Sequence, residues 1–272
     1  GSGSAVPDEA PVITQRESSV ETGNTIAIST SDNAAANVTI KDINIKSSKD
    51  AIDVTGSSSA NITLEGDNKI FSETGSALHV SDGNVTINGS GSLKAEIQDE
   101  PFGYNHNAKI HENEAMSGSI HITGDATVKT DDNIAPNCGG DGAGIGSGED
   151  GTMSGNIVID GNAQVEVSSN DQGAGIGSGD DGNLSGNIMI GGNAQVSATG
   201  AEDSAGIGAG EDGNFRGSIT IDGNAKVTAK AGGDHSGSDG SGIGAGDDGD
   251  FTGTVTIGGN AAVIAAGSDE GC

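Results

Sequence analysis

The stretch Gly142–Val167, GAGIGSGEDGTMSGNIVIDGNAQVEV, decides the fold because the chain goes on to repeat it three more times. The later copies run over Gly173–Val196, Ala205–Val227 and Ser241–Val263, so that the isoleucine of the GIG triplet stands at positions 145, 176, 207 and 243. Self-similarity with a period of about 20 to 50 residues is typical of solenoids, in which each repeat is one unit that stacks on the next.

Within one repeat, the apolar residues recur at every second position. Ile157 and Ile159 alternate with their neighbours, and residues 163–167, AQVEV, do the same after the turn pair Gly161-Asn162. A period of two predicts strands rather than helices, and Gly-Asn is a pair that tolerates the positive φ of a turn. Residues 143–147, AGIGS, predict a third, very short strand. Three short strands and three turns describe one rung of a parallel β-helix, and stacked rungs bury a continuous core.

The N-terminal half carries the first of these strands in a diverged form. The motif [N/S/T]-[V/I]-x-[I/L] begins at Asn37, Asn61, Asn84, Ser119, Asn156, Asn187, Ser218 and Thr254. A glycine shortly after each of the last seven motifs, at 66, 89, 124, 161, 192, 223 and 259, supports this register. The sequence therefore predicts an all-β protein, a single-stranded, right-handed parallel β-helix (a β-solenoid) of about eight rungs with three short strands in each rung.

Changes in pattern divide the chain. Residues 1–4, GSGS, are typical of a remnant left by cloning, so a native leader and a C-terminal anchor could both have been removed. With them, residues up to 22 are expected to form a linker or an N-terminal cap. The β-helix is expected over 23–272, with narrow rungs over 23–97, rungs with long loop insertions over 98–141 and the regular GIG repeats over 142–264.

Composition excludes several classes of partner. The formal net charge of −29 argues against nucleic acid and anionic membrane as partners, because both require basic patches, and no apolar run approaches the roughly 18 residues of a membrane span. This acidity suits an extracellular or cell-surface protein. Cys138 and Cys272 stand about four rungs apart, too far for a disulfide unless the tail folds back. Two free thiols, or a dimer bridged through Cys272, are the favoured alternatives.

Acidic turns after the GIG strands are the first candidate site. Their carboxylates are Glu149, Asp150, Asp180, Asp181, Glu211, Asp212, Asp247 and Asp248. Stacked rungs would place them about 4.8 Å apart, where like charges repel, and Ca²⁺ would relieve the repulsion through oxygen ligands. The alternative is a solvated acidic edge in which [E/D]-D-G only favours a turn. The apolar column Met116, Met153, Leu184, Phe215 and Phe251 is expected to pack the acidic loop onto the core.

A second candidate site lies in the insertion over 98–117. It contains Tyr104, His106, His111 and Glu112, which could bind a metal or a sugar, because irregular loops on a rigid scaffold often carry function. The alternative is a disordered polar insertion without a binding role.

A resemblance to a known family adds to these observations. The passage from NVTIKDINIKSS and AIDVTGSSSANITLEGDNKIFSETGSALHV into units such as GAGIGSG and SGNIVIDGNAQVEV resembles the β-helical repeat proteins of gut-dwelling Gram-positive bacteria. These are described as carbohydrate-binding or adhesin-like surface proteins. The resemblance covers about Gly23 to Ile264 and implies a binding role toward a glycan or host surface.

Three functions remain open. The first, which we expect, is a non-enzymatic, secreted or cell-surface binding module, carbohydrate-binding and adhesin-like, with assistance from calcium. The second is a structural spacer within a larger adhesin. The third is a polysaccharide lyase or glycoside hydrolase, which would require a groove with carboxylates and a basic residue. The few, scattered basic residues argue against this third function.

Overall fold

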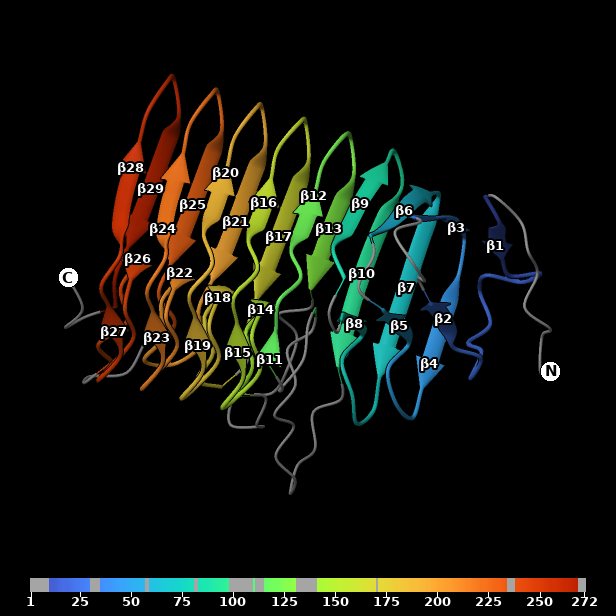
Figure 1. The fold of residues 1–272 in the computed structure, drawn as a ribbon, viewed down its shortest axis with the longest axis horizontal. Coiled ribbons are helices and arrows are strands. Elements are labelled where there is room, and N and C mark those ends of the chain that lie inside the picture. The colour runs from blue at the N-terminus through green and yellow to red at the C-terminus, as the bar shows by residue number, and fades with distance from the viewer. Residues whose placement is uncertain are drawn as a thin grey trace.

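The computed structural model describes residues 10–29, 35–56, 59–80, 83–97, 110, 115–130, 141–169, 171–233 and 238–268. The described residues form strands and turns, with no helix among them. Neighbouring strands pair in parallel and stack along the long axis of the molecule, from the N-terminus at one end to the C-terminus at the other (Figure 1). The predicted all-β solenoid is therefore confirmed.

Two long sheets run through the whole stack. Sheet A contains nine strands, β1 (Val12–Thr14), β3 (Ala36–Lys41), β6 (Ala60–Glu65), β9 (Val85–Gly89), β12 (Ile120–Ile122), β16 (Ile157–Ile159), β20 (Ile188–Ile190), β24 (Ser218–Ile221) and β28 (Thr254–Ile257). Sheet B contains eight, β4 (Asn44–Ser47), β7 (Asp67–Ser72), β10 (Ser92–Ile97), β13 (Thr127–Thr130), β17 (Gln164–Ser168), β21 (Gln195–Thr199), β25 (Lys226–Lys230) and β29 (Ala262–Ala266).

Two further walls complete the rungs. Sheet C begins with β2 (Ile26–Ser29), β5 (Ile52–Thr55) and β8 (Leu78–Val80). Single bridges at Ile110 connect β8 to β14 (Ile145–Gly146), which β18 (Ile176–Gly177), β22 (Ile207–Gly208) and β26 (Ile243–Gly244) follow. Sheet D contains β11 (Ala115–Met116), β15 (Thr152–Met153), β19 (Asn183–Leu184), β23 (Asn214–Phe215) and β27 (Asp250–Phe251).

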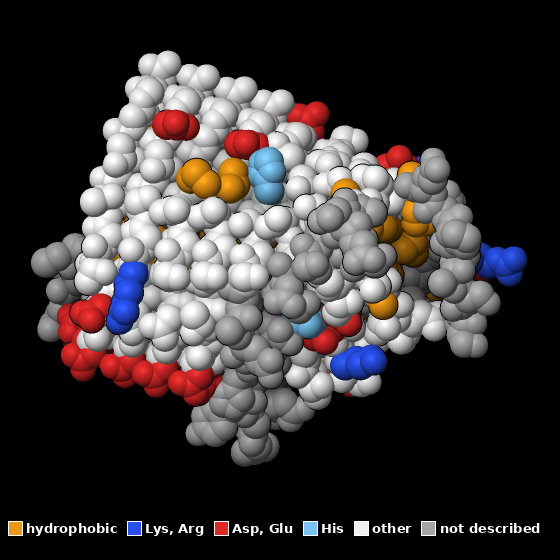
Figure 2. Space-filling view, in the orientation of Figure 1, with side chains coloured by type: hydrophobic (Ala, Val, Ile, Leu, Met, Phe, Trp, Pro, Cys, Tyr) orange, Lys and Arg blue, Asp and Glu red, His pale blue; other side chains and the backbone are white. Residues whose placement is uncertain are grey.

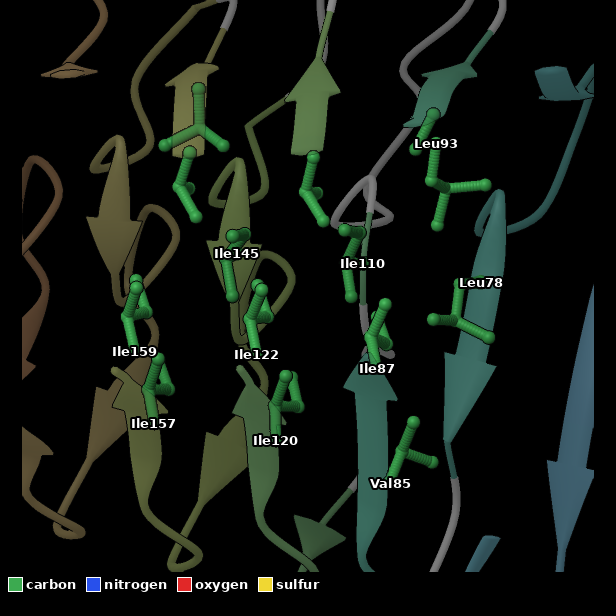
Figure 3. Close-up of a cluster of buried hydrophobic side chains, with 14 of the residues drawn as sticks. Leu78, Val85, Ile87, Leu93, Ile110, Ile120, Ile122, Ile145, Ile157 and Ile159 are labelled. Atoms are coloured by element: carbon green, nitrogen blue, oxygen red, sulfur yellow. The ribbon is translucent and has the colours of Figure 1, made fainter. Parts of the chain in front are cut away.

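In the core, similar side chains from successive rungs lie next to one another on neighbouring strands and form ladders. Ile87, Ile122 and Ile159 stand in line on neighbouring strands of sheet A, and Ile110 and Ile145 do so on sheet C (Figure 3). These isoleucines are fully buried. Because β-branched side chains fit a pleated surface, a stack of such ladders makes a dry interior with few aromatic residues.

The first correction concerns the number of strands per rung. Rungs before residue 98 have three strands as predicted, but the GIG rungs have four, because the residues after the acidic turn pair as sheet D. A two-residue strand is too short to show a period in the sequence. The expected core role of this column is confirmed for Met153, Leu184 and Phe215, which are fully buried.

A second correction concerns the register around Asn84. The motif alignment places Val85 beside Ile62, whereas the structure pairs Ile62 with Ile87 and brings Gly89 beside Leu64 instead of Gly66. A shift of two residues leaves every inward side chain inward, so alternation alone does not detect it. At Gly89, whose φ is 105°, a Cβ would lie 2.3 Å from the carbonyl oxygen of Leu64, so only glycine fits there.

The segment before residue 23 contributes one strand to the stack. Strand β1 pairs with β3 through Val12, Ile13 and Thr14 and forms the N-terminal end of sheet A. The other strands of sheet A coincide with the predicted motifs, at the expected eight levels of the stack.

Candidate functional site

The structure covers only part of the predicted site residues. Tyr104, His106, His111 and Glu112 lie outside the described residues, as do Cys138 and Cys272. A ligand site in the insertion and a dimer through Cys272 therefore stay predictions. The eight carboxylates of the acidic turns are all described.

Each acidic turn is held by backbone hydrogen bonds within its own rung and to its neighbours. In the first turn, the Gly151 amide donates to the Gly148 carbonyl over 3.1 Å, and the Asp150 amide donates to the Asp180 carbonyl of the next rung over 3.0 Å. The second acid of each turn adopts a left-handed conformation, with φ between 47° and 53°. Aspartate tolerates this region better than most residues, which explains the repeated Asp before Gly.

The turns stack in register and form an acidic edge, which we define as the eight carboxylates at 149, 150, 180, 181, 211, 212, 247 and 248. Figure 2 shows acidic side chains in a row along one edge of the molecule, beside the strands of sheet D. In each turn the first acid is half-buried and the second is exposed. The side chain of the second acid therefore faces solvent, whereas the side chain of the first is partly covered by neighbouring residues of the solenoid.

Burial and charge act together on the first acid of the second and third turns, Asp180 and Glu211. Burial, with the nearby carboxylates of Asp181, Glu211 and Asp141, raises the pKa of Asp180 from 3.8 to about 7. Its Oδ1 is enclosed and has no hydrogen-bond partner in the described structure. Burial also raises the pKa of Glu211, although the side chain of Gln172 bonds to it and opposes the shift.

Among the described residues, no group of three or more His, Cys, Asp or Glu side chains is placed to hold a metal ion. Calcium binding at these turns therefore stays a prediction from the sequence.

The outer face of sheet B is a second polar surface, and it was not predicted from the sequence. Its strands carry six of the eleven basic residues of the chain, namely Lys46, Lys69, Lys94, Lys129, Lys226 and Lys230. Lys69, Lys94 and Lys129 are direct partners on β7, β10 and β13. We call these three residues the lysine ladder.

Two hollows lie on this face, each of about 280 Å³. They share Thr127 and Lys129. Together they extend from β7 to β25, perpendicular to the strands and parallel to the long axis of the solenoid. We call this surface the sheet B strip. Its lining residues are Asp67, Asn68, Lys69, Ser92, Leu93, Lys94, Thr127, Lys129, Gln164, Val165, Glu166, Gln195, Val196, Ser197, Lys226 and Thr228.

Several outward side chains of the strip have no hydrogen-bond partner within the described structure. Gln164 and Gln195 are direct partners on β17 and β21, yet their amides do not bond to each other or to other groups. The asparagines of the nearby turns behave differently. Asn193 donates to Asn162 over 2.9 Å and accepts from Asn224 over 3.0 Å. The turn amides thus satisfy one another, whereas the amides of Gln164 and Gln195 are available to a ligand.

Within the strip, two lysines are engaged in ion pairs and two are not. Lys94 contacts Glu96 on the same strand at 2.7 Å, and Lys129 contacts Glu166 on the next strand. Lys69 and Lys226 have no ion-pair partner among the described residues. One signal in the sequence could have revealed this surface. The segments Asn68-Lys69-Ile70, Leu93-Lys94-Ala95 and Val128-Lys129-Thr130 each place a lysine between two inward positions.

The part of the chain that the structure describes contains no candidate membrane-spanning helix. Comparison of the chain with protein-family models, with curated proteins and with solved structures gives no match. The sheet B strip and the acidic edge are therefore the two surfaces from which a function can be inferred.

Proposed function

We propose that this chain is a non-enzymatic, secreted or cell-surface binding module that holds a linear glycan along the sheet B strip. The observation that carries the proposal is the row of available amide, hydroxyl and ammonium groups on one long, rigid face. A sugar chain presents hydroxyl groups at regular intervals, and a parallel sheet presents side chains at regular intervals of about 4.8 Å. Repeated polar contacts between the two would add up over several rungs, with little loss of protein entropy.

The arrangement of carboxylates in the strip supports a binding role over hydrolysis. Its two lining carboxylates, Asp67 and Glu166, lie on β7 and β17, which are three strand spacings apart in sheet B. Three spacings correspond to about 14 Å. Paired carboxylates of glycoside hydrolases stand about 5 to 9.5 Å apart. Asp67 and Glu166 are therefore too distant to act on one glycosidic bond.

A glycan array tests the proposal. The wild-type chain is compared with the variant Gln164→Ala/Gln195→Ala, which removes two available amides from the strip. The control variant is Thr220→Ala/Thr256→Ala, which shortens two outward side chains on sheet A. The proposal expects binding of a linear glycan that weakens in the first variant and persists in the second. Running the array in millimolar calcium and in chelator also tests the predicted calcium assistance.

A structural spacer is the second candidate, and the in-register pairing of nine strands in sheet A favours it. Such a stack is a rod that could hold another domain away from a surface. An array without binding in calcium and in chelator would contradict the glycan proposal and favour the spacer.

A further inference from the structure

We propose that the lysine ladder makes the strip selective for an acidic polysaccharide, a linear glycan that carries carboxylate or sulfate groups along its length. The inference rests on the proposed function and names the substrate class of the same surface. It depends on three observations, which are the register of the lysines, the charge contrast with the rest of the chain and the absence of aromatic residues from the strip.

The register places three lysine residues in one row across neighbouring strands. Lys69 pairs with Lys94 and Lys94 with Lys129, so their Cα atoms are separated by single strand spacings of about 4.8 Å. Like charges at this spacing lie within the Debye length of about 8 Å and repel each other. An anion that lies across the row would relieve the repulsion at several positions at once.

The existing ion pairs leave room for such a ligand. Lys94 and Lys129 each contact one glutamate near the surface, and exposed pairs of this kind are weak. A lysine ammonium has three donors, so a second acceptor can bind the ammonium of Lys129 without displacing Glu166. Lys69 is exposed and has no ion-pair partner among the described residues. A ligand anion would therefore gain the most binding free energy at Lys69.

Charge is distributed unevenly between the strip and the rest of the chain. The strip contains four of the eleven basic residues but only two of the forty acidic ones. On a chain with a formal charge of −29, a surface with an excess of positive charge is where a polyanion would meet the least repulsion.

The same observations disfavour nucleic acid as the polyanion. Double-stranded DNA carries one charge per about 1.7 Å, and its binding requires many basic contacts, whereas the strip offers four lysines. Single strands bind by stacking bases on aromatic side chains, and no Phe, Tyr or Trp lines the strip. An acidic glycan has a lower charge density and hydroxyl groups that suit Gln195, Ser197 and Thr228.

Affinity measurements on three chains test the inference. The wild type is compared with the ladder variant Lys69→Gln/Lys94→Gln/Lys129→Gln and with the control variant Lys41→Gln/Lys49→Gln/Arg216→Gln, which changes the net charge equally outside the strip. Polygalacturonate supplies carboxylates, dextran sulfate supplies sulfates, and neutral galactan lacks both. We expect the ladder variant to lose roughly tenfold in affinity for one or both polyanions, as three exposed charge pairs would give, while the control variant loses less than twofold.

The outcomes separate this inference from the proposed function. Loss in the ladder variant with polygalacturonate alone, or with dextran sulfate alone, identifies the carboxylate or the sulfate as the ligand group. Equal loss in both variants would show non-specific electrostatic attraction and would overturn the inference. Binding of galactan alone, unchanged in the ladder variant, would overturn the acidic selectivity but leave the glycan proposal standing. No binding of any of the three glycans would contradict both.

Discussion

Replacement of Gly186 by alanine tests the close stacking of rungs at the entrance to sheet A. A Cβ at Gly186 would lie 1.7 Å from the carbonyl oxygen of Gly155 in the preceding rung and 2.5 Å from its carbonyl carbon. These are backbone atoms, so rotation of a side chain cannot relieve the contact. Ordinary contact begins at about 3.4 Å, so the two rungs would have to separate by about 1.7 Å at this point.

Such a separation would break the hydrogen bonds beside Gly186. The Asn187 carbonyl accepts from the Ile157 amide over 2.9 Å, and the Ser185 amide donates to the Met153 carbonyl over 2.9 Å. Both would lengthen to about 4.6 Å, beyond hydrogen-bonding range. A lost bond costs about 1 kcal/mol, and a buried group left without a partner costs about 1 to 3 kcal/mol. We therefore expect Gly186→Ala to lower the free energy of unfolding by about 3 to 5 kcal/mol.

Thermal unfolding followed by circular dichroism measures the effect. For a chain of this size, about 1 kcal/mol corresponds to a Tm change of about 2 °C, so Gly186→Ala should melt about 6 to 10 °C below the wild type. Gly258→Ala is the matched control, because a Cβ there meets nothing within 4 Å, and its Tm should stay close to the wild type. Equal Tm values for the two variants would refute the packing argument.

Three further predictions concern the core, the acidic edge and the turns. Phe215→Ala should lower the free energy of unfolding by about 4 kcal/mol, because Phe215 is fully buried and stacks on Phe251 with ring centroids 5.2 Å apart. Phe215→Leu should cost about half as much or less, and equal losses in denaturant titrations would contradict this. The raised pKa of Asp180 means that the folded chain binds a proton more tightly than the unfolded chain between about pH 4 and pH 7, so stability falls as pH rises through this window. Asp180→Asn should reduce the fall, by about 2 kcal/mol after screening, and an unchanged pH profile of Tm would argue against it. Asn193→Ala removes two exposed amide hydrogen bonds and should cost about 1 kcal/mol by denaturant titration, while no loss would mean that the asparagine ladder is not stabilising.

The repeat sequence predicts the fold because the same pattern of apolar residues and turns occurs several times. The isoleucines of the GIG triplets recur with fixed neighbours, and the structure pairs Ile145, Ile176, Ile207 and Ile243 directly. The register prediction is wrong at Val85, because the motif letters align Ile62 with Val85, 23 residues on, whereas the strands pair Ile62 with Ile87, 25 residues on. A period of two constrains which side chains face inward, but it does not fix a shift of two residues.

The candidate surfaces were harder to predict than the fold. The acidic turns were found because their letters repeat in every GIG unit, and the structure does stack them in register. The lysine ladder was not predicted because its three residues belong to rungs of different length. Lys69 and Lys94 are 25 residues apart in the sequence, and Lys94 and Lys129 are 35 residues apart. The register of sheet B brings them together, and that register depends on turns whose lengths vary.

Chemical footprinting of lysines tests most directly whether the sheet B strip holds the ligand. The chain is acetylated briefly with and without a saturating glycan from the array, and the modification of each lysine is measured by mass spectrometry. We predict that the glycan protects Lys69, Lys129 and Lys226, while Lys41 and Lys49, which lie outside the strip, react as before. Protection of Lys41 or Lys49 alone, or equal reactivity of all five lysines with the glycan bound, would contradict the assignment of the binding surface to sheet B.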